Sequence, residues 1–464
     1  MKFKDILLSL SICSLLSSSA LAQRKLEPFK KGDRVVFAGN SITEAGLYES
    51  FIWLYYMLHY PDRRIEIING GVGGDVAGQI YDRLDGDLLK KKPNILAVTF
   101  GMNDSKYFEY VDKNKPMTEE KRAAIVKESF DSYAKIEGRL KRQTQIQPIL
   151  MASSPYDETV KQEGSLFTGK AITMEKIIDF QLASAKTNNW GYVDFFHPMT
   201  EINQREQKNN PAYTNTGTDR IHPGGAGHFI MAYIFLKAQG LANQKVADVQ
   251  IDARQKKVLK TTNASITALK ATKEGLSYDY LAKSLPFPVD SQARIWMNFQ
   301  VQAEALPVIP FNKEFNEEML TVKGLATKTY QLKIDGKSIG KYTSADFEQG
   351  INLALLRNTP QYEQAKQIMD LNYKRRDVES KFRNYYWVEY DFLKDKGLLF
   401  NRTQVALDTI NSNAPKNGWL NAKKGDYEAV AKDEAGVQAA MDAFTNQIYK
   451  VNKPVKWHVE IIAL

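Results

Sequence analysis

Short apolar runs and longer amphipathic stretches alternate along the first half of the chain. The apolar runs are rich in β-branched and aromatic residues, as is typical of buried strands, and they span residues 34–38, 64–69, 95–100, 148–152 and 192–194. Periodicity and capping signals between them predict helices over 51–60, 76–84, 119–141 after Thr118, and 226–239 before Gly240. This alternation predicts an α/β fold in which helices cover both faces of a parallel sheet.

The pattern changes after residue 242. Residues 245–350 carry short strand-like runs and a hairpin signal at Ile334-Asp335-Gly336-Lys337, which predict a β-rich accessory module. A helix start at Thr359-Pro360 leads into a long helical run that ends near Gly397, and a second run extends from about 426 to 451. We therefore expect residues 23–244 to form the α/β domain and residues 351–464 a C-terminal region built on a long helical hairpin.

The first 22 residues have the pattern of a cleaved secretory signal peptide. Two lysines precede an apolar stretch from Ile6 to Leu16, and a small-residue cleavage site follows at 20–22. The stretch is too short for a membrane span, and Ile12 before Cys13 argues against a lipid anchor. We expect an exported bacterial protein without a membrane anchor, located in the periplasm or secreted.

Composition excludes several classes of function. The only cysteine among the 464 residues is Cys13, so removal of residues 1–22 leaves no thiol for disulfides, metal binding or catalysis. The net charge is +9, but lysine and arginine are scattered, as on a solvated surface rather than in a nucleic-acid groove. Histidines and carboxylates do not cluster as zinc ligands would. We expect no metal, no cofactor and no nucleic-acid partner.

Polar residues that could carry chemistry follow the predicted strands. Ser41 lies just after the first strand, at a corner where α/β enzymes expose a nucleophile or bind phosphate. The glycine-rich residues 69–75 follow the second strand and allow close approach of a backbone N–H, and Asn103 follows the third as a side-chain donor. Asp219 precedes His222 by three residues, which on a tight turn lets the carboxylate reach the imidazole. A buried structural serine is the alternative for Ser41 taken alone.

Together, four sequence blocks resemble the SGNH (GDSL-type) hydrolase family over about residues 31–240. The blocks are Gly39-Asn40-Ser41-Ile42-Thr43, Gly74 before Asp75, Gly101-Met102-Asn103-Asp104, and Asp219 to Pro223. The resemblance implies a flavodoxin-like three-layer α/β/α sandwich with Ser41, His222 and Asp219 as catalytic residues. It also implies an oxyanion hole formed by Ser41, Gly74 and Asn103. Asn40 departs from the aspartate that often precedes the family's serine, and Gly70, Gly71, Gly73 and Gly78 are alternatives to Gly74.

The implied reaction is acyl transfer to water by a serine esterase, without a cofactor. The family's habits, the export pattern and the large accessory region favour an acyl ester, above all acetyl, on a polysaccharide or oligosaccharide. A lipid esterase or lysophospholipase is the enzymatic alternative. An inactive carbohydrate-binding protein is the alternative from a different class. The sequence leaves the glycan, the ester position and the oligomeric state open.

Several other residues are expected to be structural. Asp104 and Thr43 should brace loops, and His59, His197 and His458 have no partner that the sequence reveals. Aromatic residues on one long helix are typical of packing rather than sugar stacking, here Tyr385, Tyr386, Trp387 and Tyr390. Residues beyond about 244 are expected to border the cleft or pack on the domain, without supplying a catalytic or oxyanion group.

Overall fold

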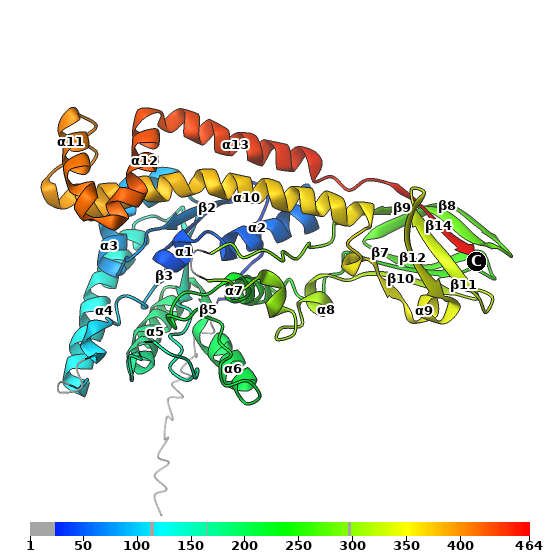
Figure 1. Ribbon diagram of the computed structural model, residues 1–464, viewed down its shortest axis with the longest axis horizontal. Coiled ribbons are helices and arrows are strands. Elements are labelled where there is room, and N and C mark those ends of the chain that lie inside the picture. The colour runs from blue at the N-terminus through cyan, green and yellow to red at the C-terminus, as the bar shows by residue number, and fades with distance from the viewer. Residues whose placement is uncertain (1–23, 112–115, 165, 296–297) are drawn as a thin grey trace, which may run out of the picture.

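The computed structural model describes residues 24–111, 116–164, 166–295 and 298–464 (Figure 1). The predicted signal peptide, with Cys13, therefore lies outside the described residues and stays a prediction. The chain forms a central α/β domain, a β-rich module at one end, and a long helix pair that runs along the domain towards that module.

A five-stranded parallel sheet forms the centre of the α/β domain. Its strand order is β2-β1-β3-β4-β5, the flavodoxin-like order, and every neighbouring pair is parallel. The strands are β1 (Arg34–Gly39), β2 (Glu66–Gly71), β3 (Ile95–Phe100), β4 (Gln147–Ala152) and β5 (Gly191–Asp194). All five predicted strands are confirmed, and no boundary moves by more than two residues.

Helices cover both faces of this sheet, which confirms the three-layer sandwich. Successive side chains of a strand point to opposite faces, so Val35 and Phe37 of β1 pack into one core whereas Val36 and Ala38 pack into the other. The first face is covered by α2 (Tyr48–His59), α6 (Phe196–Gln207) and α7 (Gly225–Ala238); the second is covered by α3 (Ala77–Asp82), α4 (Glu119–Lys141) and α5 (Lys170–Thr187). The sequence patterns did not predict α5 and α6.

The helix α2 is buried along its whole length. Every residue from Tyr48 to His59 is buried, because α7 packs on one side of the helix and α10 (Pro360–Trp387) on another. A helix that is hydrophobic all round is expected in such a sandwiched position. The aromatic-rich composition of α2 therefore reflects the C-terminal region that covers it.

The β-rich module consists of two sheets. One has the order β13-β10-β6-β7 and the other β12-β11-β14-β9-β8. The strands are β6 (Ala247–Asp252), β7 (Lys257–Thr262), β8 (Ala264–Thr272), β9 (Gly275–Ala282), β10 (Glu318–Lys323), β11 (Thr329–Ile334), β12 (Lys337–Thr343), β13 (Ile351–Asn352) and β14 (Trp457–Ala463). The predicted hairpin at Asp335-Gly336 is confirmed between β11 and β12. The short helix α9 (Ser344–Gln349) packs on β10 and β12, whereas α8 (Phe311–Phe315) buries its phenylalanines in the core of the α/β domain.

The last strand corrects the predicted division of the chain. β14 lies within residues 351–464, which we expected to be helical, yet it pairs with both β9 and β11. Its buried Val459 and Ile461 complete the core of the module, so the end of the chain returns to the β-rich module. A single strand at the end of a helical run carries no local sequence signal that predicts with which strands it will pair.

The C-terminal helical region follows the expected hairpin only in outline. The long helices α10 and α13 (Glu434–Val451) lie side by side (Figure 1). Between them the structure adds α11 (Gln404–Asn413) and α12 (Gly418–Lys432). The predicted run over 426–451 is broken at Asp433, whose side chain caps α13 by accepting a hydrogen bond from the amide of Gly436. None of the helices in the described ranges is long and apolar enough to cross a membrane.

Candidate active site

Ser41 begins a one-turn helix, α1 (Ser41–Glu44), directly after β1. The side chain of Asn40 accepts a hydrogen bond from the amide of Ile42 at 3.0 Å, so an amide caps the turn as well as an aspartate would. Gly39 is required by close packing, since a Cβ there would lie 2.3 Å from Thr43 Oγ1. Thr43 in turn hydrogen-bonds the Tyr48 hydroxyl at 3.0 Å, which confirms its bracing role.

Three residues from distant parts of the chain form a continuous hydrogen-bond chain. Ser41 Oγ lies 2.8 Å from His222 Nε2, and His222 Nδ1 lies 2.5 Å from Asp219 Oδ2. The other Asp219 oxygen accepts from the backbone amides of Ile221 and His222, which fixes the carboxylate relative to the imidazole. This is the geometry of a nucleophile, a base and a group that orients the base.

The dyad of Asp219 and His222 is accessible to solvent. The side chain of Asp219 is 46% exposed and that of His222 is 41% exposed. Burial raises the pKa of the Asp219 carboxyl, but its hydrogen bonds with His222 and the charge of that imidazole outweigh burial and hold the pKa below its usual range. Asp219 is therefore ionised at neutral pH and available to stabilise a positive imidazolium.

The turn that carries His222 is held by two side chains that sequence reasoning missed. Arg220, buried and with a positive φ of 65°, donates to the carbonyl oxygens of Asp157, Val160 and Gln162. Asn298, from the segment beyond residue 244, donates from Nδ2 to the carbonyl oxygen of His222 at 3.0 Å. No local signal marks Asn298, because its partner lies 76 positions away.

The backbone amide of Gly74 and the side-chain amide of Asn103 are two further hydrogen-bond donors, on neighbouring loops. Gly74 has a φ of +92°, where a side chain would be strained, and within the described part of the chain its amide donates to no acceptor. Asn103 donates from Nδ2 to the carbonyl oxygen of Asp75 at 2.9 Å, which places its NH₂ group next to Gly74. Its Oδ1 accepts from the Tyr107 hydroxyl at 2.8 Å, so both ends of the amide are fixed.

The other glycines of this region serve packing. A Cβ on Gly71 would lie 2.2 Å from the amide nitrogen of Glu44, and one on Gly70 would lie 2.6 Å from Leu88. A Cβ on Gly73 would lie 2.6 Å from Glu44 Oε2 and 3.9 Å from Ser41 Cβ, so Gly73 is close to the serine but crowded. Of the candidate glycines, which also include Gly78, only Gly74 has a positive φ.

Hydrogen bonds of two buried side chains hold the loop that carries Asn103 in place. Asp104 accepts from the amides of Gly101 and Ala77, both at 2.9 Å, which confirms the bracing role expected for it. Lys170, a buried residue that the sequence did not single out, donates from Nζ to the carbonyl oxygens of Met102 and Lys106, both at 2.6 Å. Burial lowers the pKa of Lys170 to about 7.

The remaining histidines do not join this site. His197 and His458 have partners that the sequence did not reveal, since their Nδ1 atoms lie 2.7 Å from Asp194 and 2.9 Å from Asp279. His59 and His228 are buried, and burial lowers the pKa of each to about 3. Over the residues that the structure describes, no three His, Cys, Asp or Glu side chains are grouped as a metal site would require.

Comparison with known proteins identifies both the catalytic domain and the helical region. The model of the GDSL-like Lipase/Acylhydrolase family matches residues 37–230. The model of the Diltiazem deacetylase C-terminal helical domain matches residues 366–453.

Two relatives extend this comparison. The structure of a gut microbial diltiazem-metabolizing enzyme is 41% identical, with a TM-score of 0.92, and the match covers 95% of this chain and 100% of that one. An acetylxylan esterase of Geobacillus stearothermophilus is 24% identical over 226 residues, which are 45% of this chain and 94% of the relative.

The flavodoxin-like sheet, the Ser-His-Asp geometry and these matches define a serine ester hydrolase of the SGNH type. The chain belongs to the GDSL-like lipase/acylhydrolase family, as its full-length similarity to a 41% identical relative establishes. Its C-terminal helices are those of the helical domain named after diltiazem deacetylase.

Proposed function

We propose that the protein removes acetyl groups from esters, with Ser41 as nucleophile, His222 as general base and Asp219 as the residue that orients the base. The continuous hydrogen-bond chain Ser41–His222–Asp219 is the observation that carries this proposal. Its order and distances match the requirements of nucleophilic acyl transfer.

The reaction proceeds in two steps. His222 Nε2 accepts the proton of Ser41 Oγ while the oxygen attacks the ester carbonyl, and His222 then returns the proton to the departing alcohol. Water, deprotonated by the same imidazole, hydrolyses the acyl-enzyme and releases the acid. The ionised Asp219 stabilises the imidazolium in both steps and keeps Nε2 directed at the serine.

The oxyanion of each tetrahedral intermediate accepts hydrogen bonds from the amides of Ser41 and Gly74 and from the Asn103 side chain. The positive φ of Gly74, its amide without an acceptor in the described chain, and the fixed amide of Asn103 support these roles. Each such donor is worth about 3 kcal/mol in the transition state.

An acetyl group is the acyl group that the relatives share by name. One relative is an acetylxylan esterase, and the helical-domain family is named after a deacetylase. The exposed dyad of Asp219 and His222 supports a bulky alcohol that stays largely in solvent. We propose a carbohydrate as that alcohol. The diltiazem-metabolizing relative, similar over the full chain, favours a second candidate, an acetate ester of a bulky aromatic heterocycle.

The N-terminal pattern supports export as a further part of the proposal. Cleavage after Ala22 would deliver the mature chain to the periplasm or the medium. Mass spectrometry of the mature N-terminus in the native host tests this, and an intact Met1 in the cytoplasmic fraction would contradict it.

The acyl preference is tested on matched p-nitrophenyl esters from acetyl to octanoyl. A deacetylase pocket ends near the methyl group, so we expect kcat/KM to fall steeply beyond propionyl. A lipid esterase would gain about 0.8 kcal/mol per buried methylene, or up to about a thousandfold in kcat/KM over six methylenes. A steady rise from acetyl to octanoyl would therefore replace the proposed function with a lipid esterase.

The alcohol is tested by following acetate release from acetylated xylan, acetylated xylo-oligosaccharides and diltiazem under identical conditions. A higher kcat/KM on the carbohydrate esters supports our proposal, and a higher value on diltiazem supports the second candidate. Ser41→Ala is the control for every substrate. Binding of glycans without hydrolysis of any ester would return the carbohydrate-binding alternative.

A further inference from the structure

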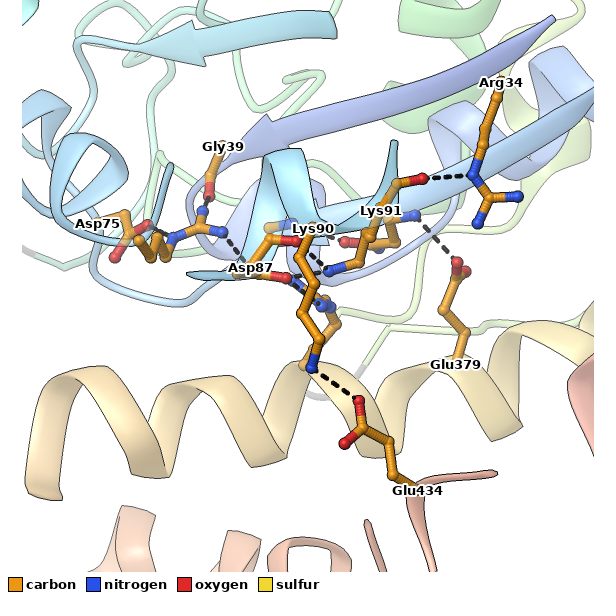
Figure 2. Close-up of polar contacts among 12 residues, drawn as sticks. Arg34, Gly39, Asp75, Asp87, Lys90, Lys91, Glu379 and Glu434 are labelled. Atoms are coloured by element: carbon orange, nitrogen blue, oxygen red, sulfur yellow. Dashed lines mark hydrogen bonds and ion pairs between the residues drawn. The ribbon is translucent and has the colours of Figure 1, made fainter. Parts of the chain in front are cut away.

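Figure 2 shows a network of polar contacts that includes Gly39, Asp75 and Asp87. Arg83, fully buried, donates from Nε to Asp75 Oδ2 at 2.6 Å and from Nη1 to Asp87 Oδ2 at 2.8 Å. Its Nη2 donates to the carbonyl oxygen of Gly39 at 3.1 Å. One planar guanidinium therefore connects three separate segments of the hydrolase domain.

Two of these three contacts adjoin the proposed oxyanion donors. Gly39 ends β1 two residues before Ser41, and Asp75 directly follows Gly74. The carbonyl oxygen of Asp75 also accepts the hydrogen bond from Asn103. Arg83 thus fixes the backbone on which the Ser41 and Gly74 amides lie, and through Asp75 the side chain of Asn103.

The third contact leads out of the hydrolase domain. Asp87 is fully buried and accepts two hydrogen bonds from Arg383 of α10, at 3.0 Å from Nη1 and 3.1 Å from Nη2. Lys91 forms a further ion pair with Asp87. These cations compensate the buried charge of Asp87. If one member of such a buried ion-pair network is removed, its partner is left as an unpaired buried charge.

The same helix region holds the glycine-rich loop by an apolar contact. Val72, two residues before Gly74, is fully buried and belongs to the same hydrophobic core as Phe382 and Tyr386 of α10. Glu379, one turn before Arg383, accepts from the amide of Asn69 in β2 at 2.9 Å. The helical region therefore contacts residues 69–75 at Asn69 and Val72, in addition to the contact of Arg383 with Asp87.

We propose that Arg383 is a positioning residue for ester hydrolysis, which holds the oxyanion loops through Asp87 and Arg83, so that the C-terminal helical region takes part in catalysis. This inference rests on the proposed function of Ser41, Gly74 and Asn103. Arg383 touches no substrate; it acts on the donors through two intermediate side chains. Its loss should weaken binding of the transition state more than binding of the substrate, because the donors act mainly on the developing oxyanion.

The test compares full-length Arg383→Met and Arg383→Lys with the wild type on p-nitrophenyl acetate. A fluorophosphonate probe that labels the reactive serine counts active sites, so that kcat is expressed per competent site. For Arg383→Met we expect kcat to fall by up to about 100-fold, the cost of a small misplacement of catalytic groups. KM should change little. Arg383→Lys should be intermediate, since a lysine keeps the charge but loses the bidentate geometry.

Asn452→Ala is the matched control for stability. Asn452 is fully buried at the end of α13 and donates from Nδ2 to the carbonyl oxygen of Met57 at 2.9 Å, remote from the loops. It should lower Tm while kcat per labelled site stays at the wild-type value. An unchanged kcat per labelled site in Arg383→Met would show a purely structural role and overturn the proposal. If Arg383→Met does not fold, an unchanged kcat in Arg383→Lys has the same meaning.

Labelling separates this inference from the proposed function. If the wild type is labelled at Ser41 and Ser41→Ala is not labelled, Ser41 is the nucleophile. This result does not depend on Arg383. Failure of the wild type to label or to hydrolyse the ester would overturn the proposed function itself, and the inference with it.

Discussion

Two turns of this protein carry the same local motif but have different surroundings. Asp194-Phe195-Phe196-His197-Pro198 follows β5, and Asp219-Arg220-Ile221-His222-Pro223 precedes α7. In both, one aspartate oxygen accepts from the histidine amide, at 3.1 Å and 3.0 Å, and the other faces Nδ1, at 2.7 Å and 2.5 Å. Both histidines are about half exposed.

Only the second turn meets a serine, and the strand order explains why. β5 is an edge strand separated from β1 by β3 and β4, so three strand spacings, about 14 Å, lie between the end of β5 and the end of β1, after which Ser41 follows. His222 instead lies 2.8 Å from Ser41 Oγ. An Asp-x-x-His-Pro turn therefore orients its imidazole by itself, whereas the chemistry of that imidazole depends on which group the fold places opposite Nε2.

The largest expected effect separates the two histidines directly. His222→Ala should lower kcat on p-nitrophenyl acetate by about 10⁶-fold, close to the effect of Ser41→Ala, because nucleophile and base act as a unit. His197→Ala should leave kcat and KM unchanged. The double variant Ser41→Ala, His222→Ala should be no worse than either single one, and full activity of His222→Ala would remove the basis of the comparison.

Substitution of the two aspartates should also lower kcat at only one of the two turns, by a smaller factor than substitution of the histidines. Asp219→Asn keeps the size of the side chain but offers the imidazole the wrong hydrogen-bonding partner, so we expect kcat to fall by about 10⁴-fold. Asp194→Asn makes the same local change at the other turn and should have no effect on kcat. Steady-state kinetics of the two purified variants measures this difference in kcat. Equal losses of kcat in both variants would show that both turns take part in the reaction.

The proposed oxyanion donors should have the next largest effect on kcat. Asn103→Ala should lower kcat by about 10²- to 10³-fold with a smaller change in KM. Tyr107→Phe, which removes the hydroxyl that orients the Asn103 amide, should lower kcat less than Asn103→Ala. A larger loss in Tyr107→Phe would indicate that the phenol itself contacts substrate.

A buried histidine gives the smallest effect and acts on stability alone. Burial lowers the pKa of His59 to about 3, below its ordinary value near 6.5, so only the unfolded chain binds the proton between these limits. The free energy of unfolding therefore falls as the pH drops below about 6.5, by about 2 kcal/mol for this residue at pH 5. His59→Phe should lose this part of the pH dependence.

Urea unfolding of wild type and His59→Phe at pH 7 and pH 5 measures the effect. Asn452→Ala, which removes no titratable group, is the control and should keep the wild-type difference between the two pH values. An identical pH dependence in wild type and His59→Phe would contradict the neutral, buried state of this imidazole.

Most of the catalytic domain could be predicted from the sequence. Its parallel strands are buried on both faces, so they read as continuous apolar runs, and all five were found. The local capping and turn motifs could also be predicted from the sequence, because the side chains of Thr118 and Asp219 accept hydrogen bonds from amides only three positions away. The five strands, four of the helices and the candidate residues Ser41, Asn103 and His222 could therefore be predicted without coordinates, whereas α5 and α6 could not.

The distant segments that support those residues could not be predicted from the sequence. Arg383 reaches Asp87 across 296 positions, Lys423 of α12 reaches Glu44 across 379, and β14 returns to pair with β9. No periodicity or capping signal encodes such contacts, because each partner alone resembles an ordinary charged or apolar surface residue. They exist because the folded chain buries these groups together, and a buried charge or strand edge must then find its partner nearby.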